Sequence, residues 1–131
     1  MKTAHWRSAH RLLPLAAVAI LVGFTAQPFH FALDKSLPEA DSAGPSPEMV
    51  QLWFTQVPQD ETTTIRVIDG NGDAVETGEV VQDGDDGKLQ SIAIGQALAP
   101  GSYTVAWRAM AADGHVVRDD FAFSVIAESD R

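Results

Sequence analysis

Residues 98–108 read Leu-Ala-Pro-Gly-Ser-Tyr-Thr-Val-Ala-Trp-Arg, and they are the most informative segment of the sequence about its fold. A tyrosine placed just after a Pro-Gly corner, at the start of an alternating run, is typical of a tyrosine corner, in which the ring hydroxyl hydrogen-bonds back to the preceding loop. Trp107 follows Tyr103 by four residues and therefore shares its face of an extended strand. We expect both rings in the core of a β-sandwich.

Alternating or β-branched runs continue on both sides of this stretch, and no helical period of comparable length competes with them. Turns rich in Gly, Asn and Asp at 69–72 and 83–87 separate several of the runs, and a connector rich in Pro, Ser and Gly occupies 38–47. This pattern predicts a seven-stranded antiparallel β-sandwich of the immunoglobulin-like class. The expected strands span residues 31–36, 49–54, 62–68, 74–81, 89–94, 103–110 and 116–125.

The chain has 131 residues and a formal net charge of −9, and this length fits one domain with a single modest core. All 18 acidic residues lie beyond residue 26, together with six of the nine Lys and Arg residues, so a chain that starts at residue 27 carries −12. Phosphate-rich partners require a basic surface. The charge therefore argues against nucleic acid or an anionic membrane as the partner.

The N-terminus has the pattern of a secretory signal peptide, because residues 1–11 are basic and residues 12–26 form an uncharged, mostly apolar stretch. A membrane span usually needs about 20 apolar residues, so an uncleaved membrane anchor is the less favoured alternative. Cleavage after Ala26 would place Phe24 where a small residue is preferred, which leaves the mature terminus open. We expect residues 1–26 to be the signal peptide, residues 27–131 to be the domain, and the protein to be exported to the periplasm or another extracytoplasmic space.

Asp113-Gly114-His115 is the strongest candidate for a ligand-binding motif. On an extended strand, positions i and i+2 face the same side, so one carboxylate and one imidazole can converge on an ion, and His30 would complete the set. The chain has no cysteine, and its two methionines outside the leader are too few for a methionine-rich Cu(I) site. Imidazole with carboxylate suits Cu(II) in a tetragonal arrangement, with zinc as the competing ion.

The acidic turn that begins at Asp69 resembles the start of a calcium loop, but the match fails at two positions. The sixth position is Ala74, where glycine is needed, and the twelfth is Val80, where a bidentate glutamate is needed. We therefore expect this turn to be a solvated hairpin.

Four segments, in order, resemble the motifs of the bacterial copper-resistance CopC family, and the resemblance covers nearly everything between His30 and Val125. The opening, His30-Phe-Ala-Leu-Asp-Lys-Ser-Leu-Pro38, resembles the family's H-x-x-L-x-x-S-x-P, and Val50-Gln-Leu-Trp-Phe54 resembles its second strand. The stretch that begins at Leu98 resembles L-x-x-G-x-Y-x-V-x-W-R. Asp113-Gly-His115, followed by Phe121-Ala-Phe-Ser-Val125, resembles the D-x-H…F-x-F-x-V ending.

The resemblance implies a cupredoxin-like or immunoglobulin-like β-sandwich that binds Cu(II) through His30, Asp113 and His115. It implies a non-enzymatic protein acting in copper resistance, homeostasis or delivery, and a CopD-like membrane copper transporter as its partner. Nothing in the sequence suggests a pocket for a small-molecule substrate or a nucleophile with an oriented base.

Two departures from the family pattern bear on the copper site. In the family the opening histidine is commonly the mature N-terminus, so that its amine adds a ligand, whereas here His30 lies several residues beyond the predicted cleavage point. Gln56 stands where the family usually has glutamate, and we expect it to hydrogen-bond near the site without adding charge. These departures predict weaker copper binding than at an amine-bearing site. The alternative is a metal-free immunoglobulin-like interaction module that keeps the scaffold of a decayed copper site.

Overall fold

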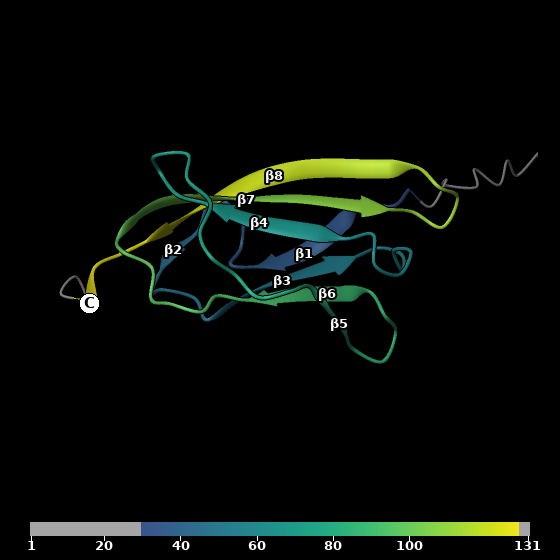
Figure 1. Ribbon diagram of the computed structural model, residues 1–131, viewed down its shortest axis with the longest axis horizontal. Helices are drawn as coiled ribbons and strands as arrows, with labels where there is room; N and C mark the ends of the chain where they lie inside the picture. Colours follow the sequence, from purple (N-terminus) through teal and green to yellow (C-terminus); the bar gives the residue numbers. More distant parts are fainter. Residues whose placement is uncertain (1–29, 129–131) are drawn as a thin grey trace, which may run out of the picture.

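The computed structural model describes residues 30–128, which form two four-stranded sheets packed face to face (Figure 1). The strands are β1 (Leu33–Leu37), β2 (Ala43–Gly44), β3 (Met49–Phe54), β4 (Thr64–Ile68), β5 (Val81–Asp83), β6 (Leu89–Ala93), β7 (Gly101–Met110) and β8 (Val116–Val125). One sheet has the strand order β1-β3-β6-β5, and the other has the order β2-β8-β7-β4. The predicted signal peptide, residues 1–26, lies outside the described residues. Within residues 30–128, no helix has the length and apolar character needed to cross a membrane.

This architecture confirms the predicted all-β sandwich class, with two differences of detail. The described residues contain eight strands where the sequence predicts seven, and β2 pairs with β8 in parallel instead of antiparallel. β2 has only two residues, inside the Pro-rich connector, so no alternating pattern announces it. Tertiary hydrogen bonds create it: the Ser124 amide donates to the Ser42 carbonyl at 2.8 Å, and the Ile126 amide donates to the Gly44 carbonyl at 2.9 Å.

The predicted strand at 74–81 is wrong, because this segment crosses from one sheet to the other. Ala74 bridges to Ile68 at the end of β4, whereas Thr77 bridges to Ile94 just after β6. A segment that changes its pairing partner within a few residues cannot form a continuous ladder. Regular pairing with β6 begins only at Val81, where β5 starts.

The predicted tyrosine corner is confirmed. The Tyr103 hydroxyl donates a 2.7 Å hydrogen bond to the Ala99 carbonyl, and the ring stacks on Phe123 with 5.5 Å between centroids. The inward-facing side chains of β7 from Tyr103 to Ala109 are buried, while the outward-facing ones are only partly buried. Burial of this alternating face against the second sheet is the dominant stabilising term of a sandwich.

A row of three aromatic rings connects the two sheets toward the end of the molecule that carries the β7–β8 turn. Phe31 stacks on Phe54 of β3 with 5.0 Å between centroids, and Phe54 meets Trp107 of β7 edge-on at 5.1 Å. All three side chains belong to the buried core. Because Phe31 follows His30 directly, this packing anchors the chain at the first predicted ligand.

Candidate metal centre

The four residues that the sequence analysis assigns to the metal site line one hollow of about 210 Å³. His30 reaches it from the segment before β1, Gln56 from the segment after β3, and Asp113 and His115 from the turn between β7 and β8. Figure 1 shows this turn at the end of the molecule opposite β2. Buried or half-buried apolar residues complete the lining: Phe31, Ala111 and Val117.

Thr55 holds the backbone on both sides of Phe31. Its hydroxyl donates to the His30 carbonyl at 2.9 Å and accepts from the Ala32 amide at 3.0 Å, and its own amide donates to the Ala32 carbonyl at 2.9 Å. The imidazole of His30 is exposed at the rim of the hollow. The backbone at His30 is thus fixed, while its side chain faces solvent.

Asp113 and His115 lie in a turn and not on an extended strand, so the predicted alternation is the wrong reason for their proximity. Gly114 has φ of +90°, in the region that favours glycine, and the Ala111 amide donates to the His115 carbonyl at 2.8 Å. Asp113 Oδ1 accepts the His115 amide at 3.0 Å. The side chains meet because this Asx-type turn folds the carboxylate back over its own backbone.

Gln59 supports the same turn from outside the hollow. Its backbone amide donates to the Met110 carbonyl at 2.9 Å, and its side-chain Nε2 donates to the Ala111 carbonyl at 2.9 Å. Sequence reasoning missed both Gln59 and Thr55 as supports of the site. Their partners lie 52 and 25 residues away along the chain, so no local pattern announces these contacts.

The electrostatics of the turn favour an ionised carboxylate next to a ring nitrogen. The His115 amide, and after it the His115 ring, hydrogen-bond to Asp113 and lower the pKa of its carboxyl below the ordinary value. His115 Nδ1 lies 2.7 Å from Asp113 Oδ2. A neutral ring carries its proton on one nitrogen and offers the lone pair of the other to a metal, so a metal at Nδ1 leaves the proton on Nε2. The side chains are 84% exposed for His115 and 63% for Asp113, so an ion has direct access to them.

Asp113 and His115 form a paired donor set, and His30 stands apart from it on another wall of the hollow. Among the described residues 30–128, no group of three or more His, Cys, Asp or Glu side chains is assembled closely enough to hold a metal ion. The fold therefore brings the predicted ligands to one hollow without closing them into a complete coordination shell.

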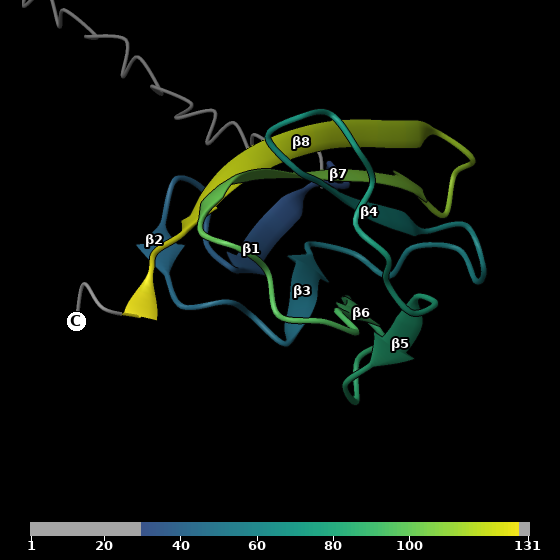
Figure 2. The same cartoon turned by 60° about the vertical axis from the view of Figure 1, so that its left-hand side comes forward.

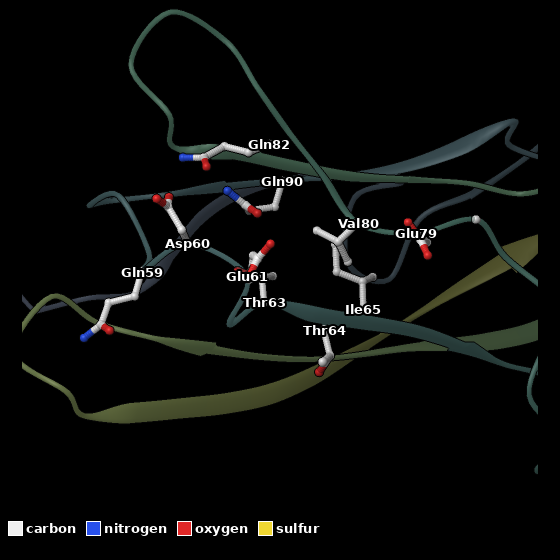
Figure 3. A pocket seen from close by; sticks show the side chains of 11 residues that line it. Gln59, Asp60, Glu61, Thr63, Thr64, Ile65, Glu79, Val80, Gln82 and Gln90 are labelled. Carbon is white, nitrogen blue, oxygen red and sulfur yellow. The ribbon is translucent and has the colours of Figure 1, made fainter.

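A larger hollow of about 960 Å³ opens along β4 and β5 and contains no histidine. Figure 3 shows its three acidic side chains, Asp60, Glu61 and Glu79, spread along its length instead of gathered at one point. Carboxylates that do not converge cannot share an ion. The smaller hollow, which contains both imidazoles, is therefore the better candidate for a metal centre.

The sequence profile of the CopC domain matches residues 33–126, a range that includes Asp113 and His115 and begins three residues after His30. Among solved structures, CopC from Methylosinus trichosporium OB3b is 29% identical, with 73% of this chain and 93% of that chain covered and a TM-score of 0.67. PcoC, a copper resistance protein from Escherichia coli, is similar in its selenomethionine form at 29% identity, with coverage of 72% and 99% and a TM-score of 0.65. A second PcoC structure, described as methionine-rich, is 28% identical, with coverage of 74% and 99% and a TM-score of 0.66. No curated protein sequence matches this chain.

Proposed function

This chain belongs to the CopC domain family, and on that premise we propose that it is an extracytoplasmic Cu(II)-binding protein acting in copper resistance, homeostasis or delivery. One observation carries the proposal: His30 lines the same solvent-accessible hollow as Asp113 and His115, although it lies more than 80 residues before them in the sequence. The proposed ion is cargo that the protein binds and releases. The proposed role is non-enzymatic.

The Asp113–His115 pair supports binding of a divalent ion through oxygen and nitrogen. Two donors set at right angles, each about 2.0 Å from one ion, lie about 2.8 Å apart. Asp113 Oδ2 and His115 Nδ1 are 2.7 Å apart, which is close to this donor–donor distance. An ion bound to both atoms would replace the proton that they share in the hydrogen bond. Such donors in a tetragonal arrangement favour Cu(II), and zinc is the competing ion.

His30 is the proposed third ligand, and a change of its side-chain rotamer would bring the ring toward the pair. Thr55 keeps the His30 carbonyl in place, so the ordering needed for copper binding is confined to the side chain. Gln56, on the same hollow, is the proposed outer partner, which can hydrogen-bond to a ligand without adding charge.

A competition titration with Cu(II) on residues 27–131 tests the proposal. This segment contains two histidines, 30 and 115, so an electron paramagnetic resonance spectrum that counts nitrogen ligands is simple to assign. We expect both His30→Ala and His115→Ala to weaken copper binding by more than about tenfold. The matched control is Asp85→Asn, an exposed change in the β5–β6 turn. Copper binding that is the same in both histidine variants and in the control would refute the assignment.

The proposal includes export and a membrane partner. We propose that residues 1–26 are the signal peptide, that residues 27–131 are the exported domain, and that a CopD-like membrane copper transporter receives or supplies the ion. The intact mass of the protein recovered from the extracytoplasmic fraction tests the first part. A mass that still contains residues 1–26 would instead support the uncleaved membrane anchor.

A metal-free interaction module is the second candidate function. It is favoured by the neutral Gln56 in the hollow and by the incomplete ligand cluster within residues 30–128. Under this alternative the protein of residues 27–131 takes up no Cu(II) in the titration above, and His115→Ala leaves that result unchanged.

A further inference from the structure

Three arginines gather on the outer face of the β8-β7-β4 sheet, and we refer to Arg66, Arg108 and Arg118 as the arginine face. Arg66 and Arg108 alternate with buried side chains along β4 and β7, and Arg118 is the direct cross-strand partner of Arg108. All three therefore lie on the face of the sheet that points away from the core. Arg108 of β7 lies directly opposite Arg118 of β8, and Arg66 of β4 lies one cross-strand row away. Figure 2 shows the three strands side by side in one layer.

This clustering is unfavourable for the isolated domain. Like charges directly opposite each other on antiparallel strands destabilise the pair. Residues 30–128 contain five Lys and Arg residues and 17 acidic ones, yet three of the five basic residues lie on this one face. The only ion pair formed within this range is the one between Asp113 and His115, so none of the three guanidinium groups has an acidic side chain within ion-pair distance there.

The arginine face surrounds a shallow hollow of about 460 Å³. The small side chain of Ala106 lies between Arg66 and Asp120 in one cross-strand row, which leaves room beside Arg108. The carboxylates of Asp119 and Asp120 also line the hollow and reduce its positive charge. Asp119 Oδ1 accepts the Asp120 amide, so this oxygen is used locally and not by an arginine.

We propose that the arginine face docks an acidic segment, rich in Asp and Glu, of a partner protein. A guanidinium group presents a planar pair of donors that matches a carboxylate in a bidentate arrangement, and three such groups around one hollow fit neighbouring carboxylates. An anionic bilayer is the less suitable partner, because a broad negative surface would repel a domain whose net charge is −12 from residue 27 onward. A short acidic segment confines its charge to the arginine face.

This inference goes beyond copper binding and does not depend on it. The arginine face nevertheless lies next to the candidate metal centre, because Arg118 follows His115 by three residues at the start of β8. A partner bound to the arginine face would therefore lie close to the β7–β8 turn.

The test uses residues 27–131 and a fluorescein-labelled octaglutamate peptide, with binding followed by fluorescence anisotropy. We expect binding at about 20 mM ionic strength that weakens by more than about tenfold near 200 mM, because salt screens exposed charges. The double variant Arg66→Glu/Arg118→Glu should bind at least about tenfold more weakly than the unaltered domain. The control Lys35→Glu/Lys88→Glu makes the same change in net charge away from this face and should bind within about twofold of the unaltered domain.

Three results would overturn the proposal: no octaglutamate binding at low salt, equal losses in the two double variants, or binding to phosphatidylserine vesicles in place of the peptide. The last result would assign the face to a membrane. Copper titrations on the same variants keep the two proposals separable, because we expect Cu(II) affinity to stay within about threefold in both double variants. Near-ultraviolet circular dichroism of both double variants tests whether the fold is intact.

Discussion

Two aspartate-led turns at opposite ends of the sandwich share nearly the same local chemistry and differ in what lies across from them (Figure 1). In the turn after β4, Asp69 Oδ1 accepts the amides of Asn71 and Asp73 at 2.9 and 3.0 Å. In the β7–β8 turn, Asp113 Oδ1 accepts the His115 amide in the same way. Only the second turn has a histidine two residues on, and only it shares a hollow with His30. An acidic turn is therefore a candidate metal centre only when the tertiary fold places further donors opposite it.

The largest expected effect separates the two turns directly. His115→Ala removes one imidazole and the partner of Asp113, and we expect Cu(II) affinity to fall by about 100-fold. Asp69→Ala disrupts the other turn and should change copper affinity by less than about twofold, although it weakens local hydrogen bonding. Competition with a chromophoric chelator measures both. A comparable loss of copper in the two variants would mean that the turns do not differ in function.

Acidification should release copper by protonating the two histidine ligands, His30 and His115, before it protonates Asp113. Because the pKa of Asp113 is lowered by the His115 hydrogen bonds, this group stays ionised until the pH falls below the ordinary range of a carboxyl. A protonated imidazole cannot ligate a metal, so protons compete with copper for the histidine ligands. Copper occupancy followed by electron paramagnetic resonance should therefore decline between about pH 7 and pH 5. Occupancy that persists to about pH 4 would indicate carboxylate ligands alone.

Adding a carboxylate on the wall of the hollow should strengthen the site moderately. Gln56→Glu places a negative charge on a residue that lines the same hollow as both imidazoles, and we expect Cu(II) affinity to rise by about three- to tenfold. The matched control is Gln96→Glu, on an exposed loop outside this hollow, which should leave the affinity unchanged. No gain from Gln56→Glu, together with no copper binding by the unaltered domain, would favour the metal-free module.

The smallest expected effect concerns the Thr55 hydroxyl, which fixes the backbone at His30 across from the β7–β8 turn. Thr55→Val removes the hydroxyl that donates to His30 and accepts from Ala32, and we expect a loss of about 0.5–1.5 kcal/mol in unfolding free energy. Copper affinity should fall about two- to fivefold, because the His30 backbone is less well ordered. Urea denaturation and copper titration measure the two effects. Thr55→Ser keeps the hydroxyl, so it should leave both the unfolding free energy and the copper affinity close to those of the unaltered domain.

The sequence predicted most of the fold because alternating burial dominates it. The strands at 49–54 and 116–125 have the predicted bounds, and the tyrosine corner forms the predicted hydrogen bond. The prediction failed at Ala43–Gly44 and at 74–81, where pairing depends on which strand lies nearby and not on a local pattern. β-pairing by such segments is specified by tertiary contacts that a short window cannot contain.

The candidate site was predictable in its members and not in its geometry. His30, Asp113, His115 and Gln56 share one hollow, but Asp113 and His115 meet through a turn that Gly114 allows, and not through strand alternation. The supports supplied by Thr55 and Gln59 depend on partners far along the chain, which single-sequence reasoning does not reach. The copper assignment itself remains a prediction that titration will decide.

The high exposure of the His115 side chain, 84%, has a kinetic consequence for a bound ion. A donor atom from an acceptor protein could approach the ion from the solvent side before any resident ligand leaves. Transfer would then be associative, through a short-lived complex in which both proteins share the metal. Its observed rate would increase with acceptor concentration, whereas release of a free hydrated ion would set a rate that the acceptor does not change.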